Sequence, residues 1–199
     1  MQDQSQRRIR VTTQRLTDAA CRLANRVGFQ AISMNELAAE LSIRAPSLYT
    51  HVSGIEEVRR LIALRGLDEL YSHLDLALSG PEGQMQALFD AYRRFALNNP
   101  GVYIAILPTP AASDIAWTSA LERLRDRLLL TLAPFNLDRR EAIHALRAMR
   151  SLAHGFVSLE LSGALKNTIG NDESYRWLVT CYLDGLSKKA SALGRKQDW

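Results

Sequence analysis

The sequence predicts an all-α protein of about nine helices, in which a small N-terminal unit is joined by a long helix to a larger C-terminal one. Three observations lead to this prediction. Apolar residues recur at steps of three and four almost throughout, which is the period of an amphipathic helix. No segment shows the sustained apolar–polar alternation of a half-buried strand. Capping-box patterns and breaks that contain glycine or proline mark where helices begin and end.

The first two helices are delimited by a glycine and by a capping box. A helix is expected from Thr13 to Val27, and Gly28 directly after it is typical of a helix C-terminus. Ser33 opens the second helix, because Glu36 stands three residues later and completes the capping box.

The third helix is short and polar. It follows the turn "LSI" and starts at Arg44, with Pro46 in the first turn, where a missing N–H does no harm. Leu48 and Val52 are expected to face inward and to hold this helix against its neighbours, which leaves its hydroxyl-rich side exposed.

A long helix then begins at Ser53, where Glu56 forms a second capping box, and continues to about residue 78. The stretch "SGPEG" at 79–83 is a turn and the expected boundary between the two units. The remaining helices are expected at about 84–98, 101–107, 113–132, 138–162 and 172–193.

Composition excludes several classes of protein. With 199 residues, 47% of them hydrophobic, the chain can bury a sizeable core without disulfides or structural metals. No apolar run is long enough to span a bilayer, and the basic N-terminus lacks the apolar segment of a secretory signal. We therefore expect a cytoplasmic protein without a membrane partner. Cys21 and Cys181 show no metal or redox spacing, so they are expected to be buried free thiols, and no metal or cofactor is expected.

The positive charge is concentrated at the N-terminal end. The formal net charge is +4, and within residues 1–60 nine arginines stand against six acidic residues. No lysine precedes Lys166, so phosphate contacts in this part must come from arginines, hydroxyls or backbone amides. The asymmetry by itself is weak support for nucleic-acid binding.

Residues 33–52 have the pattern of a helix-turn-helix: two short helices, a tight turn and exposed polar side chains on the second helix. A helix of that size fits the major groove of DNA. Arg44 and Ser47 can donate to base edges or to phosphate. Three further side chains can donate to phosphate oxygens: Tyr49, Thr50 and His51. The pattern alone leaves open the alternative of an ordinary helical hairpin in an all-α core.

The stretch "TDAACRLANRVGFQAISMNELAAELSIRAPSLYTHVSGIEEV" resembles the DNA-binding domain of TetR-type transcriptional regulators. The likeness is carried by Gly28-Phe29, Ser33, Leu37-Ala38 and Leu48-Tyr49-Thr50-His51 at the family's spacing. It implies a DNA-binding domain over residues 10–70 with its motif at 33–52, and double-stranded operator DNA as the partner. The residues expected at the DNA are Arg10, Ser33, Arg44, Ala45, Pro46, Ser47, Tyr49, Thr50 and His51.

Three positions depart from the family's pattern. The turn glycine is Ser42, and we expect the turn to tolerate it because positive φ is often unnecessary there. The family usually has an aromatic residue directly after the histidine, and this chain has the smaller Val52 there. At the start of the fourth helix the family commonly has a lysine that binds phosphate, and this chain has Ile55 there. That phosphate contact is expected to be lost unless backbone N–H groups near Ser53 replace it. Affinity should then rest more on the arginines.

The helix expected from Asp138, which forms a capping box with Glu141, is predicted to have two adjacent buried faces. Large residues form one of them, and a stripe of small residues at steps of three and four forms the other: Ala148, Ser151, Gly155, Ser158 and Ser162. A glycine inside a helix costs about 1 kcal/mol relative to alanine, so Gly155 indicates the close approach of another helix. The last helix adds Tyr175, Leu178 and Tyr182. Together these residues predict a four-helix dimer interface, and packing within one chain is the alternative.

Residues from about 85 to 190 resemble the regulatory domain of the TetR branch named for a Trp-His-Gly motif, through "YRRFALNNPGVY", "MRSLAHGFVSLELSGAL" and "NDESYRWLV". His154-Gly155 are kept, but no tryptophan precedes them. The resemblance implies a ligand-binding and dimerisation domain over 84–193, a homodimer, and a pocket for a small apolar or aromatic effector. The candidate lining, in which each residue could equally be plain core, is Phe89, Tyr92, Phe95, Tyr103, Trp117 and Met149.

These features predict a sequence-specific DNA-binding regulator, a repressor released from its operator by a small molecule, and not an enzyme. No nucleophile–base pair, phosphate-binding glycine loop or metal-spaced cluster supports catalysis. The alternative function is a helical ligand-binding or scaffold protein with weak or lost DNA binding, which the missing lysine and the missing turn glycine would favour.

Overall fold

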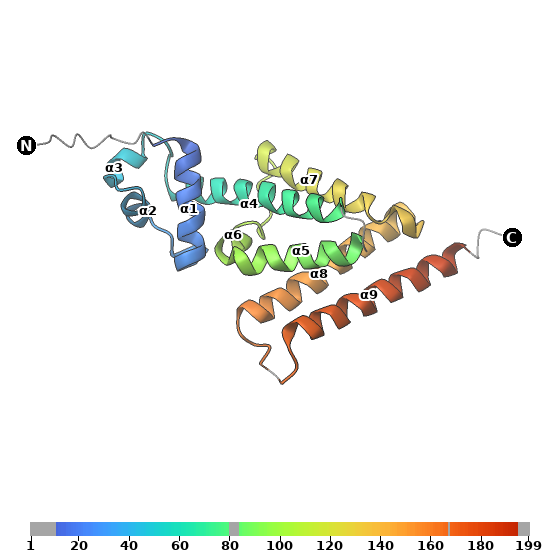
Figure 1. The fold of residues 1–199 in the computed structure, drawn as a ribbon. Helices are drawn as coiled ribbons and strands as arrows, with labels where there is room; N and C mark the ends of the chain where they lie inside the picture. The colour runs from blue at the N-terminus through green and yellow to red at the C-terminus, as the bar shows by residue number, and fades with distance from the viewer. Residues whose placement is uncertain (1–10, 80–83, 167, 195–199) are drawn as a thin grey trace, which may run out of the picture. The chain divides into compact units, whose positions relative to one another are not determined.

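The computed structural model describes residues 11–79, 84–166 and 168–194 (Figure 1). Within these ranges the chain forms nine α-helices, two 3₁₀-helices and no strand, which confirms the all-α prediction. The helices belong to two compact units. Unit 1 consists of the residues up to Arg65 together with Gly101–Pro108, and unit 2 consists of Gly66–Pro100 and the residues that follow Pro108.

Unit 1 contains the short N-terminal helices and one segment from the middle of the chain. Its elements are α1 (Thr13–Val27), η1 (Phe29–Ala31), α2 (Met34–Glu40), α3 (Ala45–Leu48), the first part of α4 (Ile55–Leu78), and α6 (Pro100–Ala105). Apolar side chains from the helices close its core, because Leu16, Leu37, Leu48 and Ile62 are all completely buried. Arg65 donates to Asp18 Oδ1 at 2.9 Å and so ties α4 to α1.

The ends of these helices follow the sequence signals with one exception. Gly28 ends α1 with a φ of +94° and donates its N–H to the carbonyl of Ala24. The capping box of Ser33 and Glu36 is confirmed. The predicted pairing of Ser53 with Glu56 is wrong, because Ser53 bonds to the carboxylate of Glu57 one residue further along. Glu56 instead accepts from Arg59 at 2.6 Å.

Unit 2 is the larger bundle. It contains the rest of α4 together with α5 (Gln84–Asn98), α7 (Ile115–Leu130), η2 (Ala133–Phe135), α8 (Arg139–Leu161) and α9 (Asn171–Gly194). Helix α5 packs on both α8 and α9, which run side by side (Figure 1). Its core holds Phe89, Phe95, Phe156, Tyr175 and Val179. The helix bounds lie within two residues of the predicted ones, and the capping box of Asp138 and Glu141 at the start of α8 is confirmed.

A charged cluster that the sequence pattern does not predict joins three helices of unit 2. Arg93 on α5 donates from Nε and Nη2 to the two carboxylate oxygens of Glu160 on α8, at 2.7 and 2.6 Å. It also donates to Asp172 on α9 at 2.7 Å, and its guanidinium lies 5.1 Å from the ring centroid of Tyr175. Because the Arg93 and Glu160 side chains are only 14% and 12% exposed, little solvent weakens this pair.

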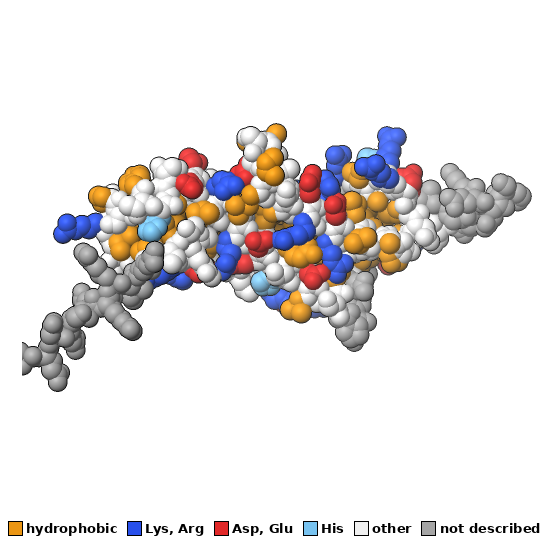
Figure 2. All heavy atoms as spheres, turned by 90° about the horizontal axis from the view of Figure 1, so that it is seen from above, with side chains coloured by type: hydrophobic (Ala, Val, Ile, Leu, Met, Phe, Trp, Pro, Cys, Tyr) orange, Lys and Arg blue, Asp and Glu red, His pale blue; other side chains and the backbone are white. Residues whose placement is uncertain are grey.

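Helix α7 is attached differently, because none of its residues from Ile115 to Leu130 is buried. Arg123 binds Asp68 and lies over the ring of Tyr71 at 4.5 Å, and Arg127 donates to Asp75 at 2.6 Å. Figure 2 shows basic and acidic side chains interleaved on this face of unit 2. Ion pairs to the second part of α4 therefore accompany a half-buried apolar face of α7, which has no fully buried stripe.

Among the described residues, none of the helices has the length and apolar character that crossing a bilayer would require. Of the two cysteines, Cys21 is buried as predicted, but Cys181 is exposed on α9, so the prediction of two buried thiols is wrong for it. The helical pattern could not show which side of α9 faces outward.

Candidate nucleic-acid interface

The turn between α2 and α3 is set by backbone hydrogen bonds at the end of α2. Ser42 N–H donates to Ala39 O and Ile43 N–H donates to Ala38 O, both at 3.0 Å, which is the pattern of a Schellman motif. Ser42 occupies the left-handed position of this motif with a φ of +55°. The expectation that the turn would not need positive φ is therefore wrong, although the turn forms with serine in place of glycine.

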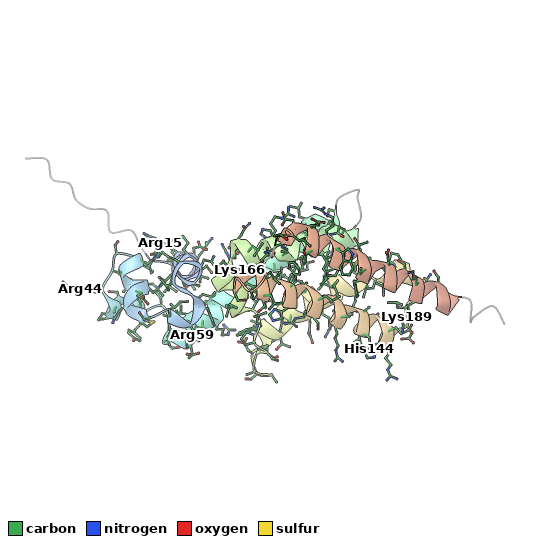
Figure 3. All side chains as sticks on the ribbon, turned by 90° about the horizontal axis from the view of Figure 1, so that it is seen from below. Arg15, Arg44, Arg59, His144, Lys166 and Lys189 are labelled. Carbon is green, nitrogen blue, oxygen red and sulfur yellow. The ribbon has the colours of Figure 1, made fainter. Side chains whose placement is uncertain are left out.

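Helix α3 presents its polar side chains outward because two apolar residues anchor it. Leu48 is fully buried and Val52 is 3% exposed, as predicted. Arg44 is the N-cap residue, Pro46 stands in the first turn, and Arg44 projects outward in Figure 3. The helix ends at Leu48, and the chain continues as a turn in which the N–H groups of His51 and Val52 both bond to the carbonyl of Leu48.

The side chains predicted to meet DNA lie on the outer side of α3 and of the turn that follows. Arg44, Pro46, Ser47, Tyr49 and Thr50 are exposed, whereas Ala45 and His51 are half-buried. Tyr49 is 58% exposed although it is a large aromatic residue. Arg10 lies outside the described residues. The structure thus brings Arg44 to His51 together on one surface, with Ser33 at the start of α2.

The arginines of unit 1 differ in how far they are engaged. Arg26 donates to Glu40 at 2.6 Å, and Arg22 lies 3.7 Å from the same carboxylate. Arg44 makes no ion pair with any residue in the described part of the chain. An exposed guanidinium without a carboxylate partner can bind a base edge or a phosphate without first breaking an internal contact.

Two of the predicted hydroxyl contacts already have partners within the chain. Ser33 Oγ donates to Glu36 Oε2 at 2.8 Å and accepts the Glu36 N–H at 3.2 Å. Thr50 Oγ1 donates to the carbonyl of Ser47 at 2.8 Å. Each hydroxyl would have to exchange a bond that it already makes before it could donate to DNA, which leaves Arg44 and Ser47 as the direct donors on α3.

The start of α4 carries its own carboxylate. Glu57 Oε2 accepts from the N–H of Ser53 at 2.5 Å and from its hydroxyl at 2.8 Å. The hydrogen bond from the Ser53 backbone is the main reason why the pKa of Glu57 lies below its usual range. A phosphate at this helix end would have to displace the Glu57 carboxylate from Ser53. The backbone N–H of Ser53 therefore does not take over the phosphate contact that the family's lysine makes at the position of Ile55.

The six residues predicted to line an effector pocket do not all lie in one unit. Phe89, Phe95 and Met149 are buried in unit 2, Tyr103 is buried in unit 1, and Tyr92 and Trp117 are half-buried in unit 2. The ring of Phe89 meets Tyr175 and Tyr182 edge-on, at centroid distances of 6.5 and 5.7 Å. The indole Nε1 of Trp117 is buried without a hydrogen-bond partner in the described structure.

The residues predicted at a dimer interface divide into surface and core. Ala148, Ser151, Ser158 and Ser162 are exposed on α8, and Gly155 and Leu178 are half-buried. A Cβ atom added to Gly155 would meet no atom within 4 Å, so the stripe does not pack closely against another helix of the same chain. Tyr175 is 1% exposed and donates its hydroxyl to the carbonyl of Phe89, so it belongs to the core of unit 2.

A groove between α8 and α9 was not anticipated from the sequence. It has a volume of about 400 Å³ and an open mouth, and Tyr182 lines it while donating its hydroxyl to the carbonyl of Ala145 at 2.7 Å. Burial raises the pKa of Tyr182 to about 12. Glu141 and Lys189 lie at the groove with their charged atoms 3.9 Å apart, and Figure 3 shows Lys189 near His144. None of the predicted effector residues lines it.

The chain is similar to known regulatory proteins over both units. Residues 16–62 match the family described as bacterial regulatory proteins, tetR family, and residues 85–182 match the tetracyclin repressor-like C-terminal domain. An uncharacterised HTH-type transcriptional regulator of Bacillus subtilis, YobS, is 30% identical over 186 residues, covering 90% of this chain and 94% of that protein. A second such regulator, from Mycobacterium tuberculosis, is 27% identical and covers 92% of this chain and 84% of its own length.

Solved structures share the fold. A tetR-family transcriptional regulator from Streptomyces coelicolor superposes with a TM-score of 0.70 at 19% identity, covering 91% of this chain and 82% of that one. A TetR variant from Acinetobacter baumannii in complex with minocycline superposes with a TM-score of 0.64 at 20% identity, covering 96% of this chain and all of that one.

Proposed function

The chain belongs to the tetR family of bacterial regulatory proteins and is a transcriptional regulator, and we propose that it is a repressor that a small molecule releases from its operator. The observation that carries the DNA-binding part is the surface of α3. Arg44 is exposed and makes no ion pair with any described residue, Ser47 and Tyr49 stand beside it, and buried Leu48 fixes the helix that carries them. In this proposal residues 10–70 bind the operator, and residues 84–193 bind the effector, form the dimer and so regulate operator binding.

The proposed operator contacts follow from which side chains are available. Arg44 and Ser47 would read base edges, with apolar contact from Ala45 or Pro46 to thymine methyl groups. Tyr49 and His51 would bind phosphate, and Arg10 would add charge from the N-terminal arm. Ser33 and Thr50 are weaker candidates because their hydroxyls already have partners. We therefore expect few base contacts and a large contribution from phosphate.

The regulatory half is proposed to bind an apolar or aromatic effector and to form a homodimer. The exposed small residues of α8, from Ala148 to Ser162, and the open space at Gly155 support a dimer face there. Trp177, which is 71% exposed on α9, is a large apolar side chain that a dimer would cover. The His154-Gly155 pair supports placement in the Trp-His-Gly branch.

The effector site is proposed around Phe89, Tyr92, Phe95, Trp117 and Met149 of unit 2. The buried, unpartnered N–H of Trp117 supports this choice, because an effector with an acceptor oxygen would satisfy it. Effector binding would shift the dimer towards a form with the wrong spacing of its two α3 helices, and α4, which runs through both units, is the expected lever.

DNA binding is tested by fluorescence anisotropy with a labelled duplex from the region upstream of the protein's own gene. We expect specific binding that weakens steeply with salt. Arg44→Ala should cost about 1–3 kcal/mol of binding free energy and relax specificity at one base position. Arg125→Ala on α7 is the matched control, since that arginine is half-exposed in unit 2. Absent or salt-insensitive binding would instead favour the ligand-binding or scaffold alternative.

A further inference from the structure

The first half of α8 has a strongly basic surface. Four arginines and a histidine are exposed on it: Arg139, Arg140, His144, Arg147 and Arg150. None of the four arginines makes an ion pair with any residue in the described ranges. Arg147 and Arg150 stand three residues apart, and like charges at that spacing destabilise a helix. A surface of this kind is expected where a protein meets an anion.

The groove between α8 and α9 lies beside this basic surface. Its volume of about 400 Å³ falls within the range of roughly 300–1,000 Å³ that is typical of small-molecule sites. Both helices contribute to its lining, with His144 and Ala145 from α8 and Tyr182, Gly185, Leu186 and Lys189 from α9. The space is therefore large enough for a compact organic ligand.

The groove has an apolar floor and a cationic edge. Ala145 and Leu186 are 6% and 7% exposed, so they form the floor. Tyr182 donates its hydroxyl to the carbonyl of Ala145 at 2.7 Å, and it offers its ring rather than a free polar group. His144 and Lys189 are exposed and lie on the two facing helices (Figure 3). The lining thus separates apolar from positively charged surface.

Helical geometry adds two arginines to the edge of the groove. Arg140 stands one turn before His144 and Arg147 one turn after it, so all three share one side of α8. Arg139 and Arg150 are eleven residues apart, which is close to three whole turns, and they share a different side of the same helix. Arg140 and Arg147 are therefore the arginines placed to reach a molecule in the groove.

One acidic side chain, Glu141, also lines the groove. Its carboxylate accepts the N–H of Asp138 at 3.3 Å as part of the capping box, and it lies 3.9 Å from the ammonium of Lys189. One negative charge thus stands against Lys189 and the two arginines of the edge. The planar guanidinium groups of Arg140 and Arg147 remain available to bind a carboxylate through paired hydrogen bonds.

We propose that this groove is a second small-molecule site, which binds a carboxylate carried by an apolar chain. The chain would lie on the floor formed by Tyr182 and Leu186, and the carboxylate would bind Arg140, Arg147 or Lys189 at the edge. None of the residues proposed for the effector site lines this groove. The inference goes beyond the proposed function and does not depend on it, because neither DNA nor that effector site takes part.

The first test uses Cys181, which lines the groove and is exposed, whereas Cys21 is buried in unit 1. The rate at which N-ethylmaleimide modifies each thiol of the full chain is followed by mass spectrometry. Decanoate should slow the modification of Cys181 and leave Cys21 unaffected. Decanol keeps the chain but has no charge, and it should protect Cys181 about tenfold more weakly.

The second test measures decanoate binding by titration calorimetry in charge variants. The double variant Arg140→Gln, Arg147→Gln should weaken binding about tenfold, because it removes the charged donors at the edge. The double variant Arg139→Gln, Arg150→Gln removes the same charge from the other side of α8, and it should stay within about twofold of the wild type because salt screens the more distant charges.

A third variant fills the groove. A Cβ atom added to Gly185 would meet no atom within 4 Å, so Gly185→Leu has room for its side chain and occupies the space that the ligand needs. Leucine also favours a helix more than glycine does, so α9 should remain folded. This variant should lose decanoate binding in the groove, whereas Ser187→Leu, at an exposed position of α9 outside the groove, should keep it.

Four results would overturn the inference. Equal protection of Cys181 by decanol and decanoate would show that the groove does not select an anion. Unchanged affinity and stoichiometry in Gly185→Leu would place decanoate elsewhere. A Cys181 that is as unreactive as Cys21 would show that the groove is closed in solution. Protection by a DNA duplex of unrelated sequence, but not by decanoate, would make the basic surface of α8 a polyanion site instead.

Discussion

Ser42 occupies the left-handed position of the Schellman motif in the helix-turn-helix, where glycine is the commonest residue. Its φ of +55° is unfavourable for a residue with a Cβ atom, by roughly 1–2 kcal/mol relative to the right-handed region. The Schellman bonds on either side hold it there, because Ser42 and Ile43 both donate to carbonyls of α2. The protein therefore tolerates serine at a cost in stability.

Ser42→Gly should stabilise the protein by about 1 kcal/mol, less the extra freedom that glycine gives the unfolded chain. The melting temperature should rise by about 2–4 °C for a chain of this size. The control is Ser72→Gly in the middle of α4, where glycine should destabilise by a similar amount. Equal effects of the two changes in a thermal melt would contradict the strain assigned to Ser42.

Tyr49 is the largest exposed side chain next to α3, and its hydroxyl is the group proposed to bind phosphate. Tyr49→Phe should weaken binding to all duplexes by a similar factor, because phosphate carries no sequence information. Anisotropy on the operator and on a scrambled duplex measures this. A loss confined to one base position would show that Tyr49 reads sequence instead.

Among the elements, α5, α8 and α9 are joined at one point by Arg93. The hydrogen bonds that it donates hold the pKa of Glu160 below its usual range, and the two carboxylates raise the pKa of Arg93. A carboxyl with a lowered folded pKa stabilises the protein above its unfolded pKa and loses that contribution as the pH falls through the folded value.

Glu160→Gln should therefore lower the free energy of unfolding by about 3 kcal/mol at neutral pH, because it leaves a largely buried guanidinium with only Asp172. The difference from wild type should narrow as the pH falls below the pKa of the unfolded carboxyl and through the lowered pKa of folded Glu160, where the wild-type carboxyl takes up its own proton. Urea unfolding at several pH values gives this comparison. Glu122→Gln, at an exposed position on α7, should show no pH-dependent difference.

The elements themselves were predictable because local signals mark their ends. Gly28, Ser33 and Asp138 each stand where a helix begins or ends, and apolar spacing alone identified Leu48 and Val52 as buried. The contacts between distant residues were not predictable. Nothing near Asn25 in the sequence points to Gly101, whose N–H its side chain accepts, and nothing near Arg93 points to Glu160. Helical periodicity defines a face but not the partner of that face.

At the scale of the whole molecule, the proposed dimer interface lies on the exposed small residues of α8. Gly155→Leu places a branched side chain on the small stripe and should convert dimers to monomers in sedimentation velocity, with operator binding weakened in parallel. Ala116→Leu adds the same side chain at an exposed position of α7 and should leave the mass unchanged. An unaltered mass for Gly155→Leu would place the dimer face elsewhere.

The discontinuous make-up of unit 1 also bears on how the protein is made. A ribosome releases α1 to α3 well before residues 101–108 exist, and at about 5–20 residues per second the delay lasts several seconds. Until then the side chain of Asn25 lacks the N–H groups of Gly101 and Val102 that it accepts in the folded chain, and the surface that α6 will cover is open. The nascent chain therefore cannot complete unit 1 until residues 101–108 have been made. A truncated chain that ends before Gly101 lacks part of unit 1, so it has no complete DNA-binding unit that could occupy an operator without regulation.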